Sequence, residues 1–104
     1  MVKVTAPIIN LPPVAVFDSC NQVLGVTAFT CNLIGNDSDP EGDPISITGF
    51  SANSDTPGAL LSSSLLNGVL SFTVDPTKPQ TITISYTLSD GTHSVTGTAG
   101  AKIA

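Results

Sequence analysis

Three runs in the second half of the chain alternate apolar and polar residues with a period of two, and they constrain the fold most. The runs span 68–74, 81–88 and 93–104. Their apolar positions on one face are Leu70, Phe72, Val74, Ile82, Ile84, Tyr86, Leu88, Val95, Ala99, Ala101 and Ile103. Since successive side chains of a strand point to opposite faces, the pattern predicts three strands that each bury one face. We expect these faces to build the core, with the Tyr86 hydroxyl bonded to a backbone group.

Turn signals separate these runs from further β-rich segments. Short strands are expected at 14–17, within 23–34 and at 45–50. Asn67-Gly68 suits a two-residue hairpin turn, because both of its positions need positive φ, and it predicts a strand at about 59–66 before the turn. The poorly patterned stretch 51–64 is expected to form a long surface loop or an irregular crossing segment. Together these elements predict an all-β, antiparallel Ig-like β-sandwich of about seven strands.

The N-terminal segment differs from the rest of the chain. Residues 1–13 contain three prolines and no sustained period, which favours an extended arm or linker. The sandwich is expected to occupy 14–104, and 104 residues leave little room for a second domain.

Charge and composition exclude several classes of function. The net charge of -5 opposes binding to phosphate backbones and anionic lipids, so we expect no nucleic-acid partner. No apolar run reaches the length of a spanning helix, which argues against membrane insertion. With one His and no Arg, the chain lacks a convergent set of catalytic groups, and we expect that it is not an enzyme.

The segment NDSDPEGD, residues 36–43, concentrates acidic side chains at alternating positions. Its carboxylates offer the hard oxygen ligands that Ca²⁺ takes, and they belong to Asp37, Asp39, Glu41 and Asp43. An EF-hand is rejected, because Thr48 stands where the closing Glu is needed and a strand-like run replaces the second helix. The alternative is a plain turn, in which Asx-turns, Pro40 and Gly42 reverse the chain without any metal.

Cys20 and Cys31 are eleven positions apart and have no Cys/His companions, unlike a CxxC metal or redox pair. A disulfide is the first interpretation, and it would place the chain in an oxidising compartment. Two small buried thiols remain the alternative.

Three segments of the chain resemble a known family. PPVAVFD, NLIGNDSDPEGDPISITGF and ISYTLSDG are similar to the corresponding segments of bacterial cadherin-like and Ig-like repeats of large surface proteins and adhesins. The resemblance runs from about Pro12 to Gly91 and implies an extracellular cadherin-like sandwich, often calcium-dependent. It adds two ligands to the acidic loop, Asp90 from the SDG turn and Asp18 from the end of a neighbouring strand. Of the six carboxylates, we favour Asp39, Asp43 and Asp90. The two cysteines are not a feature of the family.

The resemblance implies a non-catalytic structural or adhesion module on an extracellular surface, rigidified by calcium and in contact with neighbouring repeats. An alternative starts from Met1 and the lack of a signal peptide: a stand-alone Ig-like decoration protein at a virion surface, with particle subunits as partners. A carbohydrate-binding module that contacts surface glycans is the third interpretation. It is weakened because Phe17, Phe29, Phe50 and Phe72 fall at core-like positions, which leaves few rings for a sugar platform.

Overall fold

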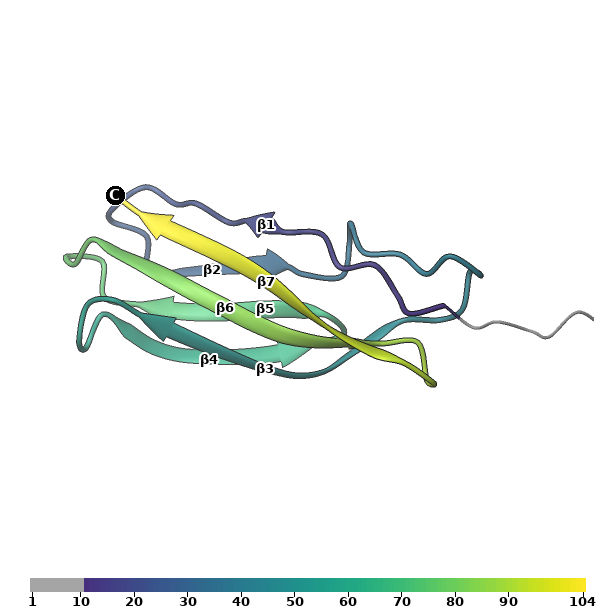
Figure 1. Cartoon of the computed structure of the whole chain (residues 1–104). Helices are drawn as coiled ribbons and strands as arrows, with labels where there is room; N and C mark the ends of the chain where they lie inside the picture. The colour runs from purple at the N-terminus through teal and green to yellow at the C-terminus, as the bar shows by residue number, and fades with distance from the viewer. Residues whose placement is uncertain (1–10) are drawn as a thin grey trace, which may run out of the picture.

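The chain forms two β-sheets that face each other (Figure 1). The structure is a computed structural model and describes residues 11–104. Its strands are β1 (Asp18–Ser19), β2 (Ala28–Asn32), β3 (Ser46–Ser54), β4 (Leu60–Leu66), β5 (Val69–Val74), β6 (Gln80–Ser89) and β7 (Ser94–Ile103). The predicted all-β Ig-like sandwich is confirmed. Within residues 11–104, no helix is long and apolar enough to cross a membrane.

Strand order divides the chain between a four-stranded and a three-stranded sheet. The first has the order β1-β7-β6-β3 and the second β2-β5-β4. All pairs are antiparallel except β1 with β7, where Asp18 lies opposite Ala99. Beyond β1 the chain continues along β7, as the N–H of Cys20 donates to the carbonyl of Gly100 at 2.8 Å. The first strand thus closes one edge of the larger sheet.

The core lies between the two sheets and is built from the predicted alternating positions. Each of these residues is at most 2% exposed, except Val95, which is partly buried against the others. Phe72 of β5 stacks on Phe29 of β2, with ring centroids 5.1 Å apart. Burial of these inner faces removes apolar surface from water and supplies the main stabilisation of the sandwich.

The Asn67-Gly68 hairpin turn is confirmed. Both residues have positive φ, 52° and 79°, and they join β4 to β5 with Leu66 opposite Val69. The turn thereby fixes the register of this pair.

The prediction of a long loop over 51–64 is wrong. β3 continues to Ser54, which lies opposite Ile82 of β6, and β4 begins at Leu60. The small polar side chains of this stretch are mostly solvent-accessible. Backbone pairing with β6 and β5 holds the strands, and Ala52 and Leu60 add contacts with the core. Only 55–59 connects them.

The predicted strand at 14–17 is also absent, because this segment is held by a loop instead of a sheet. Val14 exchanges both backbone hydrogen bonds with Ser38 as an isolated bridge. Phe17 is 59% exposed rather than in the core, and its ring lies over Gly100 of β7. Residues 1–10 of the predicted N-terminal arm lie outside the described residues, so the arm stays a prediction.

The two ends of the sandwich differ in the loops that they carry. One end bears loop 33–45, the Asn67-Gly68 turn and the β6–β7 turn 90–93, and we call it the acidic end. The opposite end bears the C-terminus, where β7 finishes (Figure 1).

Candidate metal centre

The acidic loop is a turn organised by Asp39. One oxygen of Asp39, Oδ1, accepts hydrogen bonds from the N–H groups of Glu41 and Asp43, at 2.9 and 3.1 Å. Gly42 adopts a φ of 76° and donates its N–H to the Asp39 carbonyl at 3.0 Å. The turn expected from the sequence is therefore present, and Asp39 carries it.

Asp90 organises the turn on the other side in the same way. Its Oδ1 accepts hydrogen bonds from the N–H groups of Thr92 and His93, at 2.9 and 2.6 Å. These bonds hold the pKa of Asp90 below its ordinary value, and its side chain is fully buried. His93 Nδ1 lies 4.0 Å from Asp90 Oδ2. Asp90 is thus an anion directed into the acidic end by its own turn.

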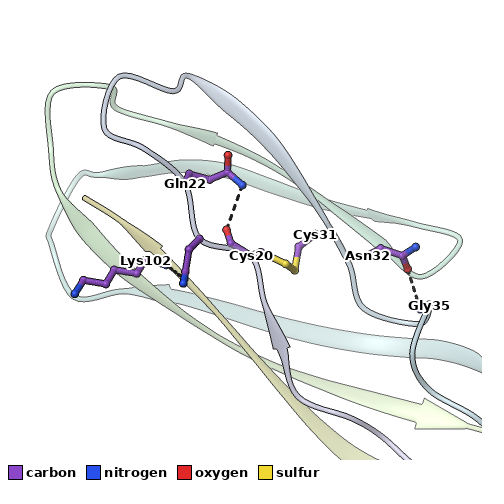
Figure 2. The surroundings of a disulfide bond; sticks show 7 residues. Cys20, Gln22, Cys31, Asn32, Gly35 and Lys102 are labelled. Carbon is purple, nitrogen blue, oxygen red and sulfur yellow. Dashed lines mark hydrogen bonds between the residues drawn. A yellow bond between two sulfur atoms is a disulfide. The ribbon is translucent and has the colours of Figure 1, made fainter.

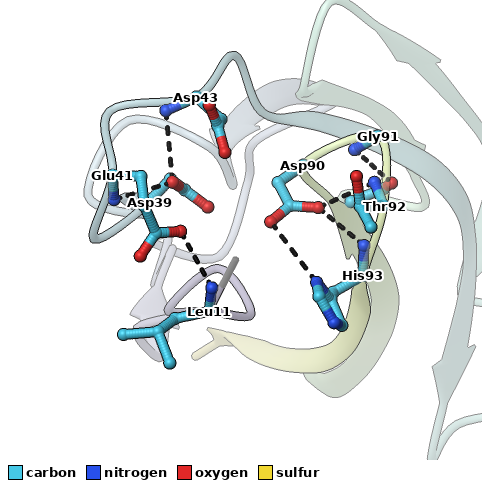
Figure 3. Close-up of polar contacts among 9 residues, drawn as sticks. Leu11, Asp39, Glu41, Asp43, Asp90, Gly91, Thr92 and His93 are labelled. Atoms are coloured by element: carbon cyan, nitrogen blue, oxygen red, sulfur yellow. Dashed lines mark hydrogen bonds and ion pairs between the residues drawn. The ribbon is translucent and has the colours of Figure 1, made fainter. Parts of the chain in front are cut away.

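The loop and the turn bring four carboxylates together (Figure 3). Asp39, Glu41, Asp43 and Asp90 each offer one oxygen, and these oxygens all lie within 4.8 Å of one another. Asp39 Oδ2 is buried and accepts no hydrogen bond from a described residue. Four like charges at this spacing repel one another, and a buried acceptor without a partner costs further free energy. A hard cation that binds carboxylate oxygen would relieve both costs.

Asp37 and Asp18 lie outside this group of four. Asp37 is buried beside it, and its two oxygens accept from the Tyr86 hydroxyl and the Val16 N–H, each at 2.8 Å. The expectation that the Tyr86 hydroxyl bonds a backbone group is therefore wrong. Because a carboxylate that already accepts two such bonds is solvated by the protein, Asp37 has less need of a cation.

Asp18 stands in β1 and meets Asn36 rather than the four clustered carboxylates. Burial raises the pKa of Asp18, the negative charge of Asp37 raises it further, and a hydrogen bond with Asn36 opposes the rise. Its Oδ2 is buried without a hydrogen-bond partner in the described chain.

The acidic loop also holds the segment that leads into the sandwich. The Leu11 N–H donates to Glu41 Oε1 at 3.0 Å (Figure 3), and the Val14 N–H donates to the Ser38 carbonyl at 2.7 Å. Val16 adds its bond to Asp37. The sequence alone gave no sign of this contact, because it depends on which loop the irregular segment crosses. One loop therefore joins the carboxylate cluster to the start of the described chain.

The two cysteines form a disulfide across the sandwich (Figure 2). Cys20 follows β1 at the edge of the larger sheet, and Cys31 lies fully buried in β2 of the smaller one. The alternative of two buried thiols does not describe this structure. The bond links the two sheets away from the carboxylate cluster.

Comparison with known proteins agrees with this architecture. The sequence model of the bacterial Ig domain matches residues 10–103. The chain belongs to the bacterial Ig domain family. A search of curated protein sequences found no significant match. This Ig domain is similar to part of a solved structure from Bacteroides fragilis described as a "putative alpha-galactosidase", with a TM-score of 0.58 and 14% identity. The match covers 97% of this Ig domain but 19% of that chain, so it concerns the fold alone.

Proposed function

We propose that this Ig domain is a non-catalytic structural or adhesion module that binds Ca²⁺ at its acidic end. The observation that carries the proposal is the gathering of four carboxylate oxygens within 4.8 Å, one side chain of which, Asp39, keeps a buried oxygen without a partner. The metal would be held by Asp39, Glu41, Asp43 and Asp90, a subset of the six residues predicted from the sequence.

The donor set favours calcium over other divalent metals. It consists of carboxylates on two turns, with neither a thiolate nor an imidazole in the group, which disfavours zinc and copper. Mg²⁺ demands a near-ideal octahedron and retains several waters, whereas Ca²⁺ accepts six to eight oxygens in adaptable arrangements. Backbone carbonyls and water would complete the shell.

Bound calcium would act as a cross-link. Asp39, Glu41 and Asp43 belong to the loop between β2 and β3, and Asp90 belongs to the β6–β7 turn, so one ion would join two turns that are far apart in the sequence. The same loop bonds Leu11 and Val14, which means that stiffening it would also fix the direction in which the N-terminal segment leaves the sandwich. A module in a row of neighbours would gain a rigid connection at this end.

An extracellular location is supported by two independent features. Bacterial Ig domains are typically extracellular, and a disulfide persists in oxidising surroundings. We infer that the partners are protein surfaces, either neighbouring repeats or subunits of a particle. Gene context separates these: similar repeats in one long reading frame support surface display, whereas adjacent capsid or tail genes support a virion decoration protein and contradict the adhesin proposal.

Thermal unfolding tests the calcium site. We expect EDTA to lower the melting temperature and added Ca²⁺ to restore it, since a ligand that binds only the folded state stabilises it. With dissociation constants of about 0.1 to 1 mM, typical of extracellular modules, ~10 mM Ca²⁺ contributes about 1.4 to 2.7 kcal/mol.

Asp90→Asn should remove most of this response. Asp75→Asn is the matched control, because Asp75 also accepts two hydrogen bonds within its own turn, from Thr77, but lies at the opposite end. A melting temperature that is insensitive to both EDTA and Ca²⁺ would leave the acidic loop as a turn and nothing more.

A further inference from the structure

A buried tyrosine on β6 is hydrogen-bonded to the acidic loop next to the carboxylate cluster. The Tyr86 hydroxyl donates to Asp37 Oδ2 at 2.8 Å, and the Tyr86 side chain is 1% exposed. Asp37 stands two positions before Asp39 in the acidic loop, and Tyr86 stands four positions before Asp90 on β6. The bond therefore connects the loop that carries Asp39 to the strand that leads into the turn of Asp90.

Gly97 makes this reach possible. It lies opposite Tyr86 in the β6–β7 pair, and the tyrosine ring crosses it. A Cβ at position 97 would stand 2.2 Å from Tyr86 Cζ and 2.6 Å from its hydroxyl oxygen, distances that real atoms do not adopt. Any side chain at position 97 would displace the tyrosine ring, so the hydroxyl can reach Asp37 only because residue 97 is glycine.

The other oxygen of Asp37 extends the connection to the first segment. Oδ1 accepts the Val16 N–H at 2.8 Å, next to the bridge between Val14 and Ser38. Two hydrogen bonds therefore hold the buried side chain of Asp37, and they fix the backbone two positions before Asp39. A carboxylate that accepts two such bonds in a buried place is held far more firmly than one on a free loop.

We propose that the Tyr86 hydroxyl is a positioning group for the metal site: through Asp37 it sets the separation of Asp39 and Asp90 before any ion binds. This inference rests on the proposed calcium function. Tyr86 does not touch the ion. Its effect is preorganisation, because a loop already held in its bound arrangement loses less conformational entropy when the metal arrives.

Tyr86→Phe tests the proposal, since it removes only the hydroxyl and keeps the ring. We expect the calcium dissociation constant to rise by up to about ten-fold, the lower limit for removal of a direct partner of a metal ligand, because Tyr86 acts one residue further away through Asp37. Asp37→Asn keeps one oxygen to accept the Val16 N–H, and its NH2 group can donate to the Tyr86 hydroxyl oxygen, so it should give a smaller rise. Ile103→Val is the matched control, because it trims the same core at the opposite end, lowers the melting temperature and should leave calcium affinity within about two-fold.

A second measurement, in EDTA, keeps the test independent of calcium. Amide hydrogen exchange at Glu41 and Asp43, whose N–H groups bond Asp39, should be faster in Tyr86→Phe than in the wild type and unchanged in Ile103→Val. If the wild type binds no calcium, the proposed function fails and this exchange alone decides the positioning role. Unchanged exchange, unchanged affinity, or equal effects in both variants would overturn it.

Discussion

The sandwich body and the acidic end are held together by different forces. In the body, strands pair through their backbones, alternating apolar side chains fill the space between the sheets, and a disulfide joins them. At the acidic end, carboxylates accept backbone N–H groups and thereby shape both turns. The body depends on burial, whereas the acidic end depends on charges that gain from a cation. Stability and the proposed binding are therefore separable.

Charge follows the same division. Six of the eight acidic residues lie at the acidic end or beside it, namely Asp18, Asp37, Asp39, Glu41, Asp43 and Asp90. Lys78 and Lys102 belong to segments near the opposite end. The acidic end thus carries a concentrated negative field that attracts cations and is weakened by salt.

The largest effect is expected in the body. Phe72→Ala removes a buried ring that stacks on Phe29, and it should lower the free energy of unfolding by about 3 to 5 kcal/mol in a urea titration. Calcium affinity of the folded fraction should not change, because Phe72 lies outside the cluster. A weakened affinity would mean that the two regions are coupled.

The disulfide comes second. Replacing both Cys20 and Cys31 by Ala opens an eleven-residue loop and should cost about 3 kcal/mol by the chain-entropy estimate. Denaturant unfolding of the oxidised wild type, the reduced wild type and the double variant measures this. A double variant as stable as the oxidised protein would show that the bond does not support the body.

Two glycines with nearly equal φ, both at the acidic end, compare a turn that touches Ile34, which packs on the core of the body, with the carboxylate loop. Gly68→Ala places a Cβ 2.5 Å from Ile34 Cγ2, whereas Gly42→Ala meets nothing within 4 Å, at φ of 79° and 76°. Strain in this region costs about 1 to 3 kcal/mol, so Gly42→Ala should fall at the low end and Gly68→Ala at or above the high end. Only Gly42→Ala should also weaken calcium binding. Equal losses of stability in the two variants would show that the Ile34 side chain moves aside at no cost and would contradict the prediction.

Asp18→Asn should change the stability least, and it should raise the stability where the preceding substitutions lower it. Because the pKa of Asp18 is raised in the folded state above its ordinary 3.8, the folded chain binds this proton more tightly than the unfolded chain. Ionised Asp18 is therefore destabilising at neutral pH, and this cost disappears as pH falls through the raised pKa. Asp18→Asn should melt slightly higher than the wild type at pH 7 and lose this advantage near pH 3. A variant that is less stable at pH 7 contradicts the assignment.

Much of the sandwich body could be predicted from the sequence, because its strands and hairpin depend on patterns within short segments of the chain. Period-two alternation named the buried faces of β5, β6 and β7, and the φ requirement of Asn67-Gly68 located the hairpin. The predictions were wrong where backbone pairing, and not an alternating sequence pattern, decides the structure. The serine-rich part of 51–64 forms strands because β5 and β6 supply backbone partners, and Phe17 lies outside the core because loop 37–38 holds its segment.

The acidic end was predictable in composition but not in detail. The sequence named six candidate carboxylates, and four of them meet. The difference depends on side-chain direction: Asp37 turns inward to Tyr86, and no spacing rule distinguishes it from Asp39 two positions later. The link between Gly97 and Tyr86 leaves no motif at all, since it is a contact across neighbouring strands.

Calorimetric titration with Ca²⁺ tests the central claim most directly. Wild type stripped of metal should bind one ion, with a dissociation constant of about 0.1 to 1 mM. The Asp39→Asn/Asp43→Asn variant retains, at position 39, a side-chain oxygen that can accept the N–H groups of residues 41 and 43, so it should unfold in EDTA like the wild type yet give no binding heat. Absence of heat from the wild type at ~10 mM Ca²⁺, or identical binding by the variant, would contradict a calcium site at the acidic end.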